Sequence, residues 1–359
     1  MFRGCGAAGS APAWHAGGQG FKSPQLHMVS ASSASSAPSG LTNFQLPKGW
    51  RRIEPADSLV GKHVVVTGAS SGLGLETSRA CVAAGAKVTM AVRNIAKSSL
   101  LIPQLEVGTS GKITLLPLDL SSLKSISTAA AEITTPIDIL VLNAGVMATP
   151  LRHTDDGFEL QMGTNHLGHF AFAGRIFDAL IEGARVVTVS SQAHRIGSFS
   201  SDNSQKIIDQ CYGRGEYEPW GAYGRSKLAN LLFTLELHRR SVQGRLPNRK
   251  RIEPMAAHPG WSATNLQAVG AQMKNQPLME RGSNVVNALF AQSAKQGALP
   301  ILCAATFPGL PSGSYLGPDG FLEMRGYPKL TRASSAAYDQ VLAEKLWEIS
   351  SELTGVAWS

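Results

Sequence analysis

Short runs of aliphatic and β-branched residues recur along the chain and alternate with segments of helical length. The first run is followed by LGLETSRACVAAGA, whose apolar positions have helical spacing. Nearly continuous apolar strands separated by helices are typical of a parallel sheet covered on both faces. The pattern therefore predicts a single doubly wound α/β domain. The runs are HVVVTG from His63, KVTMAVR from Lys87, KITLLPLDL from Lys112, IDILVLNAG from Ile137 and ARVVTVSS from Ala184.

The first fifty residues lack this pattern and differ in composition. They are rich in Gly, Ala and Ser, contain no acidic residue, and have no apolar block long enough for a secretory signal. This composition predicts an organelle transit peptide, with plastid favoured over mitochondrion because Ser and Ala are frequent and Arg is scarce. The alternative is a disordered tail that carries no targeting signal, in which case the protein is cytoplasmic. Met28 is a second candidate for the initiator methionine. We expect disorder over 1–50 and the folded domain over 58–359.

Composition and charge exclude several other classes. The chain has 359 residues and 43% hydrophobic content, but Asp138 and Asn143 interrupt its longest apolar run, so no transmembrane segment is predicted. Four cysteines lie far apart, which argues against a disulfide framework or a structural metal. Of the formal charge of +8, residues 1–53 supply +5, so nucleic acid is not an expected partner. The densest basic segment, 239–251, is predicted to be a solvated loop between a helix and a strand. Contact with an anionic membrane or a partner is the alternative.

Ligands of such sheets bind at the carboxyl ends of the strands, and the first strand ends in TGASSGLG. Gly68 would allow a tight turn, Gly72 a close approach of the backbone to a pyrophosphate, and Gly74 close packing of the following helix. The amides at the helix start, around Ser70, Ser71 and Leu73, would then face the anion. The turn predicts a dinucleotide site, because it lies between a strand and a helix.

Arg93 ends the second strand about nineteen residues after Gly74, where the ribose of a dinucleotide should lie. An acidic residue there would accept a hydrogen bond from the 2′-hydroxyl of NAD, whereas a guanidinium suits the 2′-phosphate of NADP. We therefore predict NADP(H). An exposed loop arginine without a ligand is the alternative.

Tyr223 and Lys227 stand four residues apart in GAYGRSKLANLL, so they project from the same face of a helix. Free tyrosine titrates near 10 and is a poor acid or base at neutral pH. A neighbouring ammonium favours the phenolate, and lowering the pKa by about 3 units corresponds to about 4 kcal/mol. The spacing predicts a tyrosine tuned for proton transfer.

Together these residues resemble the short-chain dehydrogenase/reductase family over about residues 60–322. The further motifs, in family order, are DL at 119–120, NAGV at 143–146, TNHLGHF around Asn165, VSS ending at Ser191, YGRSK at 223–227 and HPGWSAT at 258–264. The resemblance implies a Rossmann fold and hydride transfer between a nicotinamide and a carbonyl or alcohol, with no metal.

The resemblance also implies roles for individual residues. Tyr223 would be the general acid or base, Ser191 would orient the substrate oxygen, Lys227 would hold the nicotinamide ribose, and Asn165 would anchor a relay water. The remaining cofactor contacts implied by the family are Asp119 and Leu120 near the adenine, Asn143, Ala144 and Gly145 beside the cofactor, Pro259 and Gly260 beneath the nicotinamide, and Thr264.

Two inserts distinguish this chain from short members of the family. Thirty-one residues separate Ser191 from Tyr223. This long insert, at about 195–220, resembles the branch with retinol dehydrogenases and protochlorophyllide-reductase-like proteins, whose substrates are often bulky and apolar. Its aromatic residues are candidates for the pocket wall, with surface packing as the alternative. The second insert, at about 262–285, is predicted to be a substrate lid with Met273 and Met279. The insert aromatics are Tyr212, Tyr217 and Trp220.

The remaining reactive side chains are predicted to be structural. His258 has no recognisable partner cluster in the sequence and is interpreted as a loop histidine, and His166, His169 and His194 are interpreted in the same way. Nothing around Cys211 indicates an activated thiolate.

Two alternatives to an NADP(H)-dependent oxidoreductase are considered. One is a non-catalytic NADP-binding regulatory or scaffold protein, which the four filled catalytic positions disfavour. The other is a light-dependent reductase of the protochlorophyllide type, for which no residue argues. By analogy with the family, a homodimer or homotetramer is expected.

Overall fold

The computed structural model describes residues 44, 46–55, 58–200, 202–261 and 292–358, and these contain one eight-stranded sheet. The strand order is β3-β2-β1-β4-β5-β6-β7-β8. All neighbouring strands are parallel except β7 and β8, which are antiparallel. The order reverses between β1 and β4, which is the place where doubly wound sheets bind ligands. The strands are β1 (His63–Thr67), β2 (Lys87–Val92), β3 (Lys112–Pro117), β4 (Ile137–Leu142), β5 (Leu180–Val189), β6 (Glu253–Ala257), β7 (Tyr315–Pro318) and β8 (Pro328–Leu330).

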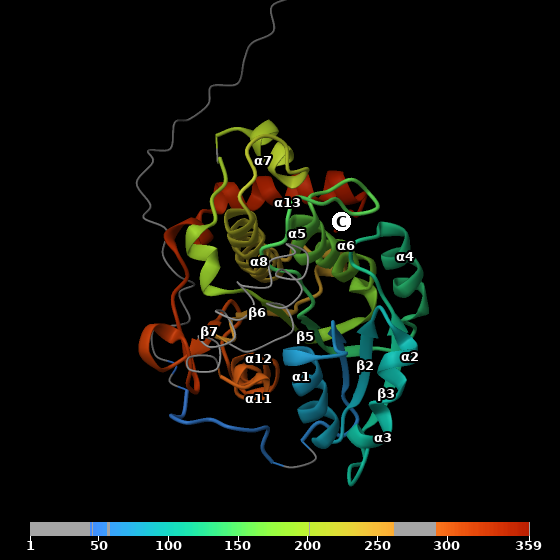
Figure 1. Ribbon diagram of the computed structural model, residues 1–359. Coiled ribbons are helices and arrows are strands. Elements are labelled where there is room, and N and C mark those ends of the chain that lie inside the picture. The colour runs from blue at the N-terminus through green and yellow to red at the C-terminus, as the bar shows by residue number, and fades with distance from the viewer. Residues whose placement is uncertain (1–43, 45, 56–57, 201, 262–291, 359) are drawn as a thin grey trace, which may run out of the picture. The chain divides into compact units, whose positions relative to one another are not determined.

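Helices cover both faces of the sheet, as the sequence predicts (Figure 1). The α-helices are α1 (Gly72–Ala83), α2 (Ile95–Ser99), α3 (Ile102–Leu105), α4 (Leu123–Glu132), α5 (Leu160–Met162), α6 (Gly168–Arg175), α7 (Ser204–Cys211), α8 (Pro219–Val242), α11 (Ala294–Gly297), α12 (Leu299–Thr306) and α13 (Gln340–Thr354).

Successive residues of the central strands enter opposite hydrophobic cores, which explains why these strands are apolar throughout. In β1, Val64 and Val66 pack in the core that contains α1 and α12. Val65, between them, packs in the core that contains α4, α6 and the second half of α8. All five residues of β1 are buried. A strand buried on both faces leaves no polar alternation, so the continuous apolar run is the correct signal for it.

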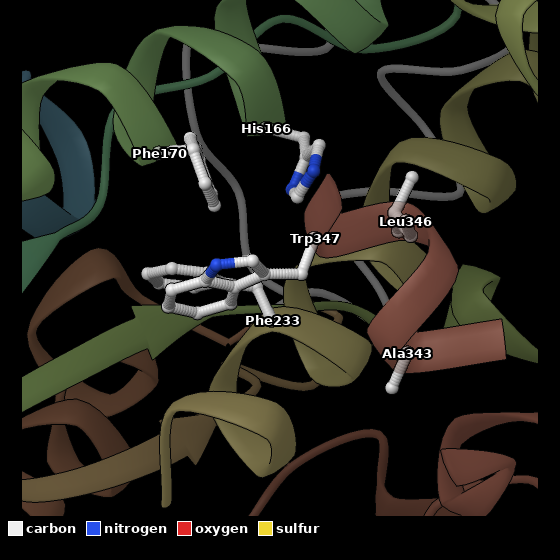
Figure 2. A pocket seen from close by; sticks show the side chains of 6 residues that line it. All are labelled: His166, Phe170, Phe233, Ala343, Leu346 and Trp347. Atoms are coloured by element: carbon white, nitrogen blue, oxygen red, sulfur yellow. The ribbon is translucent and has the colours of Figure 1, made fainter. Parts of the chain in front are cut away.

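An aromatic cluster joins α6, α8 and α13 on the second face (Figure 2). The ring of Phe170 meets that of Trp347 edge-on at 5.1 Å, and Phe233 stacks on Trp347 at 5.7 Å. His166 lies beside them, and the space that these side chains enclose has no volume for a water molecule. Such aromatic pairs stabilise a fold beyond their burial alone. The cluster therefore fixes α8 against the segment that carries Asn165.

The structure corrects two details of the predicted elements. Strand β5 begins at Leu180 rather than Ala184, because Leu180 pairs with Ile137 before a register shift in β4. The residues near the start of β5 include exposed ones and interrupt the apolar run, so the sequence pattern did not show this extension. Arg239 and Arg240, predicted to lie in a basic loop, belong to the last turn of α8. Within the described ranges no helix is long and apolar enough to cross a membrane.

Candidate active site

Three glycines shape the turn between β1 and α1. Gly68 and Gly72 have φ angles of +66° and +56°, in the left-handed region that favours glycine. A Cβ on Gly74 would lie 2.5 Å from the Gly68 carbonyl oxygen, so α1 starts in direct contact with the turn. Within the described chain, α1 has no acidic residue in its first turn and its N-cap Ser71 forms no capping hydrogen bond. These open amides fit a pyrophosphate. Half-buried Ser70 and buried Leu73 complete the turn.

Thr67, at the end of β1, connects this turn to the Asn143–Gly145 segment. Its hydroxyl oxygen accepts hydrogen bonds from the backbone amides of Asn143 (2.9 Å) and Ala144 (3.0 Å). The Asn143 side chain donates to the Thr67 carbonyl (2.8 Å). A Cβ on Gly145 would lie 2.9 Å from the Asn165 side-chain oxygen and 3.5 Å from the Lys227 ammonium. The segment therefore touches both the glycine turn and the predicted catalytic residues.

Ser191, Tyr223 and Lys227 meet at the carboxyl end of β5. The Ser191 hydroxyl is close enough to the Tyr223 phenol to interact with it and to lower its pKa. The Lys227 ammonium lies 5.7 Å from the centre of the Tyr223 ring and donates to the Val189 carbonyl (3.1 Å). Tyr223 and Lys227 are 7% and 4% exposed, so both ionisable groups are largely withdrawn from water.

Burial reverses the predicted shift of the Tyr223 pKa. It raises the pKa of Tyr223 to about 12, and the interaction with Ser191 offsets only part of this rise. Burial also lowers the pKa of Lys227 to about 8, so its charge is lost at mildly alkaline pH rather than near the usual pKa of lysine. The expectation of a phenolate-favouring lysine is wrong for the protein alone, because desolvation outweighs the effect of an ammonium directed at Val189.

Asn165 lies in a five-residue π-helix, Gly163–Leu167, ahead of α6. Its side-chain oxygen accepts from the Val146 amide (2.7 Å), and its side-chain nitrogen donates to the Val146 carbonyl and the Ser226 hydroxyl (both 2.9 Å). Its backbone carbonyl accepts from Nδ1 of His169 (2.9 Å). Asn165 thus ties the Asn143–Gly145 segment to α8, and its predicted water-anchoring role stays a prediction.

His169 completes a buried chain of hydrogen bonds that the sequence did not indicate. Its Nδ1 donates to the Asn165 carbonyl, so its Nε2 accepts from the Thr67 hydroxyl (2.9 Å). His166 bonds Ser350 on α13, and His194 bonds the Ser191 carbonyl. The buried, hydrogen-bonded state of these three histidines agrees with their predicted structural role.

The adenine end of the predicted cofactor site contains Arg93 and Asp119. Arg93 follows β2 directly and is exposed, and it makes no ion pair with any residue in the described ranges. One oxygen of the Asp119 carboxylate accepts from the Ser121 amide (2.9 Å) and hydroxyl (2.6 Å). The neighbouring Leu120 is buried. Arg93 and Asp119 thus lie at the ends of adjacent strands. The Arg93 guanidinium suits the phosphorylated ribose of a dinucleotide, and the fixed Asp119 carboxylate suits its adenine.

The Pro259–Gly260 turn follows β6, and Gly260 has a φ of +67°. A Cβ there would lie 2.4 Å from the Met324 carbonyl oxygen, so only glycine fits against this neighbour. The Pro259 carbonyl accepts from the Gln292 side chain. Thr264, the predicted lid at 262–285, and Met273 and Met279 within it lie outside the described residues.

His258, just before this turn, has partners that the sequence did not reveal. It is fully buried, and its Nε2 lies 3.1 Å from the Glu323 carboxylate. His258 lies in the loop after β6, as predicted, but it has a carboxylate partner that the sequence did not reveal. Sixty-five residues separate the two groups along the chain, so local spacing could not have shown the pair.

The aromatic residues of the first insert have different surroundings. The Tyr217 hydroxyl bonds buried Glu159 (2.9 Å), and Tyr212 packs on Phe158 at 5.4 Å, so both fasten the insert to the domain. Trp220 is 41% exposed and meets the ring of Tyr223 edge-on at 6.0 Å. Of the three, Trp220 is the candidate for substrate contact.

Two other predictions concern the insert and the basic segment. Cys211 is buried, and burial raises its pKa to about 12, which agrees with the absence of an activated thiolate. In the basic segment, Arg239 and Arg240 pair with buried Glu236, and Arg245 lies 3.7 Å from it. Part of the positive charge is therefore neutralised within the domain.

The glycine-rich turn after β1 suits a dinucleotide, and it lies at the same edge of the sheet as Ser191, Tyr223 and Lys227. This combination is typical of a nicotinamide-dependent oxidoreductase. The short chain dehydrogenase family model matches residues 62–202. A "Probable oxidoreductase" of Streptomyces lividans is 35% identical over 309 residues, which cover 82% of this chain and 98% of that protein. The chain therefore belongs to the short-chain dehydrogenase family, whose members act on alcohol and carbonyl groups.

Two further comparisons extend over most of the domain. Retinol dehydrogenase 12 of Homo sapiens is 35% identical, over 88% of this chain and 90% of that protein. The crystal structure of an uncharacterized protein from Mycobacterium Paratuberculosis has a TM-score of 0.69 and 36% identity, over 87% of this chain and 99% of that one. The relatives support neither the non-catalytic alternative nor the light-dependent one.

Proposed function

We propose that this chain is an NADP(H)-dependent oxidoreductase that interconverts a carbonyl and an alcohol on a bulky, apolar substrate. The observation that carries the proposal is the contact of the Tyr223 phenol with the Ser191 hydroxyl, with Lys227 one helical turn further along α8. In this arrangement two hydroxyl groups converge on the place where a substrate oxygen would be held.

A bound nicotinamide would supply or accept the hydride. In reduction, Ser191 donates a hydrogen bond that orients the substrate oxygen, and Tyr223 donates its proton to that oxygen as it gains charge. A pKa of about 12 keeps the phenol protonated at physiological pH, which suits this direction. In oxidation Tyr223 must first be a phenolate, which the Lys227 ammonium would stabilise, and this phenolate accepts the proton of the alcohol and becomes a phenol.

Replacing Tyr223 by Phe tests the proton-transfer step. Tyr223→Phe should lower kcat for aldehyde reduction by roughly 10²- to 10⁴-fold, because the general acid is lost. The affinity for NADPH, measured by cofactor fluorescence, should change little. Tyr212→Phe makes the same change away from the site and serves as the control. Near wild-type turnover in Tyr223→Phe would exclude this role.

The proposed preference for NADP(H) is supported by exposed Arg93. Arg93→Ala should weaken NADPH binding about tenfold or more, because a charge-assisted contact to the 2′-phosphate is lost. NADH binding should not change. Lys97→Ala, on the neighbouring α2, controls for a general loss of positive charge. Equal affinities of the wild-type protein for NADPH and NADH would refute the preference.

A bulky, apolar substrate is supported by exposed Trp220 beside Tyr223 and by the similarity to a retinol dehydrogenase. Trp220→Ala should raise KM for decanal about tenfold, since burying an aromatic side chain is worth on the order of 1 to 3 kcal/mol. KM for propanal should stay within about twofold, because so short a chain cannot cover the ring. Trp220→Phe should recover most of the loss, and equal effects on both aldehydes would contradict this assignment.

We further propose that residues 1–50 direct the protein to an organelle, with plastid favoured. Their composition supports this proposal. A fluorescent protein fused behind residues 1–50 should enter plastids, and the same fusion begun at Met28 tests which start is used. Diffuse cytoplasmic fluorescence from the longer fusion would indicate that residues 1–50 are a disordered tail without a targeting signal.

A further inference from the structure

Glu323 lies where three segments that are distant in the sequence meet. One carboxylate oxygen accepts from the Gln192 side chain and lies 3.1 Å from Nε2 of His258. The other accepts from the Thr331 hydroxyl and lies 3.5 Å from the Lys329 ammonium. The Glu323 side chain is 17% exposed, so these contacts replace most of its water. Both oxygens of the carboxylate are therefore committed to the protein.

The ring of His258 is fixed in one tautomer by its two neighbours. The backbone amide of Gly260 donates to Nδ1 (3.2 Å), so Nδ1 carries no hydrogen in the neutral ring. The hydrogen is then on Nε2, where it is directed at Glu323. A hydrogen bond to a charged carboxylate is stronger than one between neutral groups. Glu323 thereby holds both the position and the tautomer of His258.

The backbone adopts an unfavourable conformation to place this carboxylate. Leu322 and Glu323 have φ angles of +48° and +57°, which residues other than glycine rarely adopt. Phe321 and Leu322 are left 83% and 69% exposed, while Glu323 turns inward. Strain of this kind persists only where the surroundings fix it, and it gathers at functional sites.

The residues that Glu323 holds are next to the active-site groups. Gln192 directly follows Ser191, which contacts Tyr223. His258 directly precedes the Pro259–Gly260 turn, where Trp261 donates its amide to the Met324 carbonyl (2.7 Å). One carboxylate thus connects the segment that orients the substrate oxygen with the turn predicted to lie beneath the nicotinamide.

Further hydrogen bonds tie the Ser191 segment to the residues that follow Glu323. His194 donates to the Ser191 carbonyl (2.6 Å) and accepts from the Ser334 amide (3.0 Å). Arg195 donates to the Arg332 carbonyl (2.8 Å). Residues 323–334 therefore act as a clamp on the 191–195 segment.

We propose that Glu323 is a positioning residue that sets the relative placement of Ser191 and the Pro259–Gly260 turn through Gln192 and His258. The proposal rests on the proposed function, because it assigns these two segments to substrate and cofactor. Glu323 itself touches neither and takes no part in proton or hydride transfer.

The first test measures binding and turnover of the full-length protein with NADPH and decanal. Glu323→Ala removes all four contacts, whereas Glu323→Gln keeps the shape and loses the charge. Glu323→Ala should lower kcat and weaken NADPH binding, each by about tenfold to a hundredfold, because small displacements of reacting groups are costly. Glu323→Gln should fall between it and wild type. The control is Glu253→Gln, at the opposite end of β6, which should leave both quantities unchanged.

The second test needs neither cofactor nor turnover. The ¹⁵N chemical shifts of His258 report its tautomer, and the amide resonances of Ser191 and Gly260 report the placement of the two segments. Both sets should shift in Glu323→Gln and Glu323→Ala and stay constant in Glu253→Gln. They remain informative if the wild-type protein proves inactive toward decanal, a result that would count against the proposed function alone.

Two results would overturn the proposal. One is a lower melting temperature of the Glu323 variants with unchanged kcat and unchanged NADPH affinity, which would mark Glu323 as merely structural. The other is an unchanged pattern of His258, Ser191 and Gly260 resonances. If Glu323→Ala does not fold, Glu323→Gln decides both questions.

Discussion

At the scale of single residues, burial determines the chemistry of the site. Tyr223 and Lys227 are both withdrawn from water, and their pKa values move toward the neutral forms, to about 12 and about 8. The Tyr223 phenol therefore keeps its proton over the whole physiological range, whereas Lys227 loses its charge at mildly alkaline pH. The two residues respond to pH in different ranges, although they share one face of α8.

This separation predicts how cofactor affinity depends on pH. The Kd for NADPH should rise above about pH 8, because Lys227 then loses the proton with which it would bind the ribose. Lys227→Met should bind NADPH weakly at every pH, with no transition near 8. Fluorescence titrations from pH 6.5 to 9.5 measure both, with Lys97→Met as the control. A wild-type Kd that is constant across this range would count against the assigned role of Lys227.

At the scale of elements, the sequence predicts the helices and strands that depend on neighbouring residues. It misses the features that form between segments far apart in the chain. The strands through β6, α1 and α8 are predicted, because continuous apolar runs and glycine turns depend on neighbouring residues. The short β7 and β8, the π-helix at 163–167 and the His258–Glu323 pair are missed. Each of these depends on a partner far along the chain, such as Asn165 of the π-helix bonding Ser226 across 61 positions.

The hydrogen bonds of His169 make a prediction for the π-helix. His169→Phe should lower the free energy of unfolding by about 2 to 4 kcal/mol, because the Thr67 hydroxyl and the Asn165 carbonyl both lose a buried partner. Urea unfolding at pH 7.5 measures the loss. Exposed His153→Phe is the matched control and should cost about 0.5 kcal/mol or less. Equal losses in the two variants would show that the His169 bonds are not needed for stability.

At the scale of the whole molecule, buried histidines link stability to acid. Burial lowers the pKa of His166 to about 3 and those of His169 and His194 to about 4. In the unfolded chain each should titrate near 6.5. Their contribution to stability is therefore complete above about pH 6.5 and is lost as the pH falls toward 4, because the unfolded state then binds more protons.

The free energy of unfolding is therefore predicted to depend steeply on pH. With three such groups, the free energy of unfolding should fall by up to about 4 kcal/mol per pH unit below pH 6. Urea unfolding at pH 7.5, 6.0 and 5.0 measures it, and His169→Phe should reduce the slope by about one proton. A stability that does not change between pH 7 and pH 5 would be incompatible with neutral, buried histidines.

The clamp at residues 323–334 has a consequence for the order in which the protein is made. The ribosome releases the glycine turn, Ser191 and Tyr223 long before Glu323, so a nascent chain can contain every predicted catalytic side chain and still lack the contacts that align them. Full activity should therefore appear only after the last portion of the chain has emerged and docked. A growing or prematurely terminated polypeptide would therefore carry these side chains without the contacts that bring them into register.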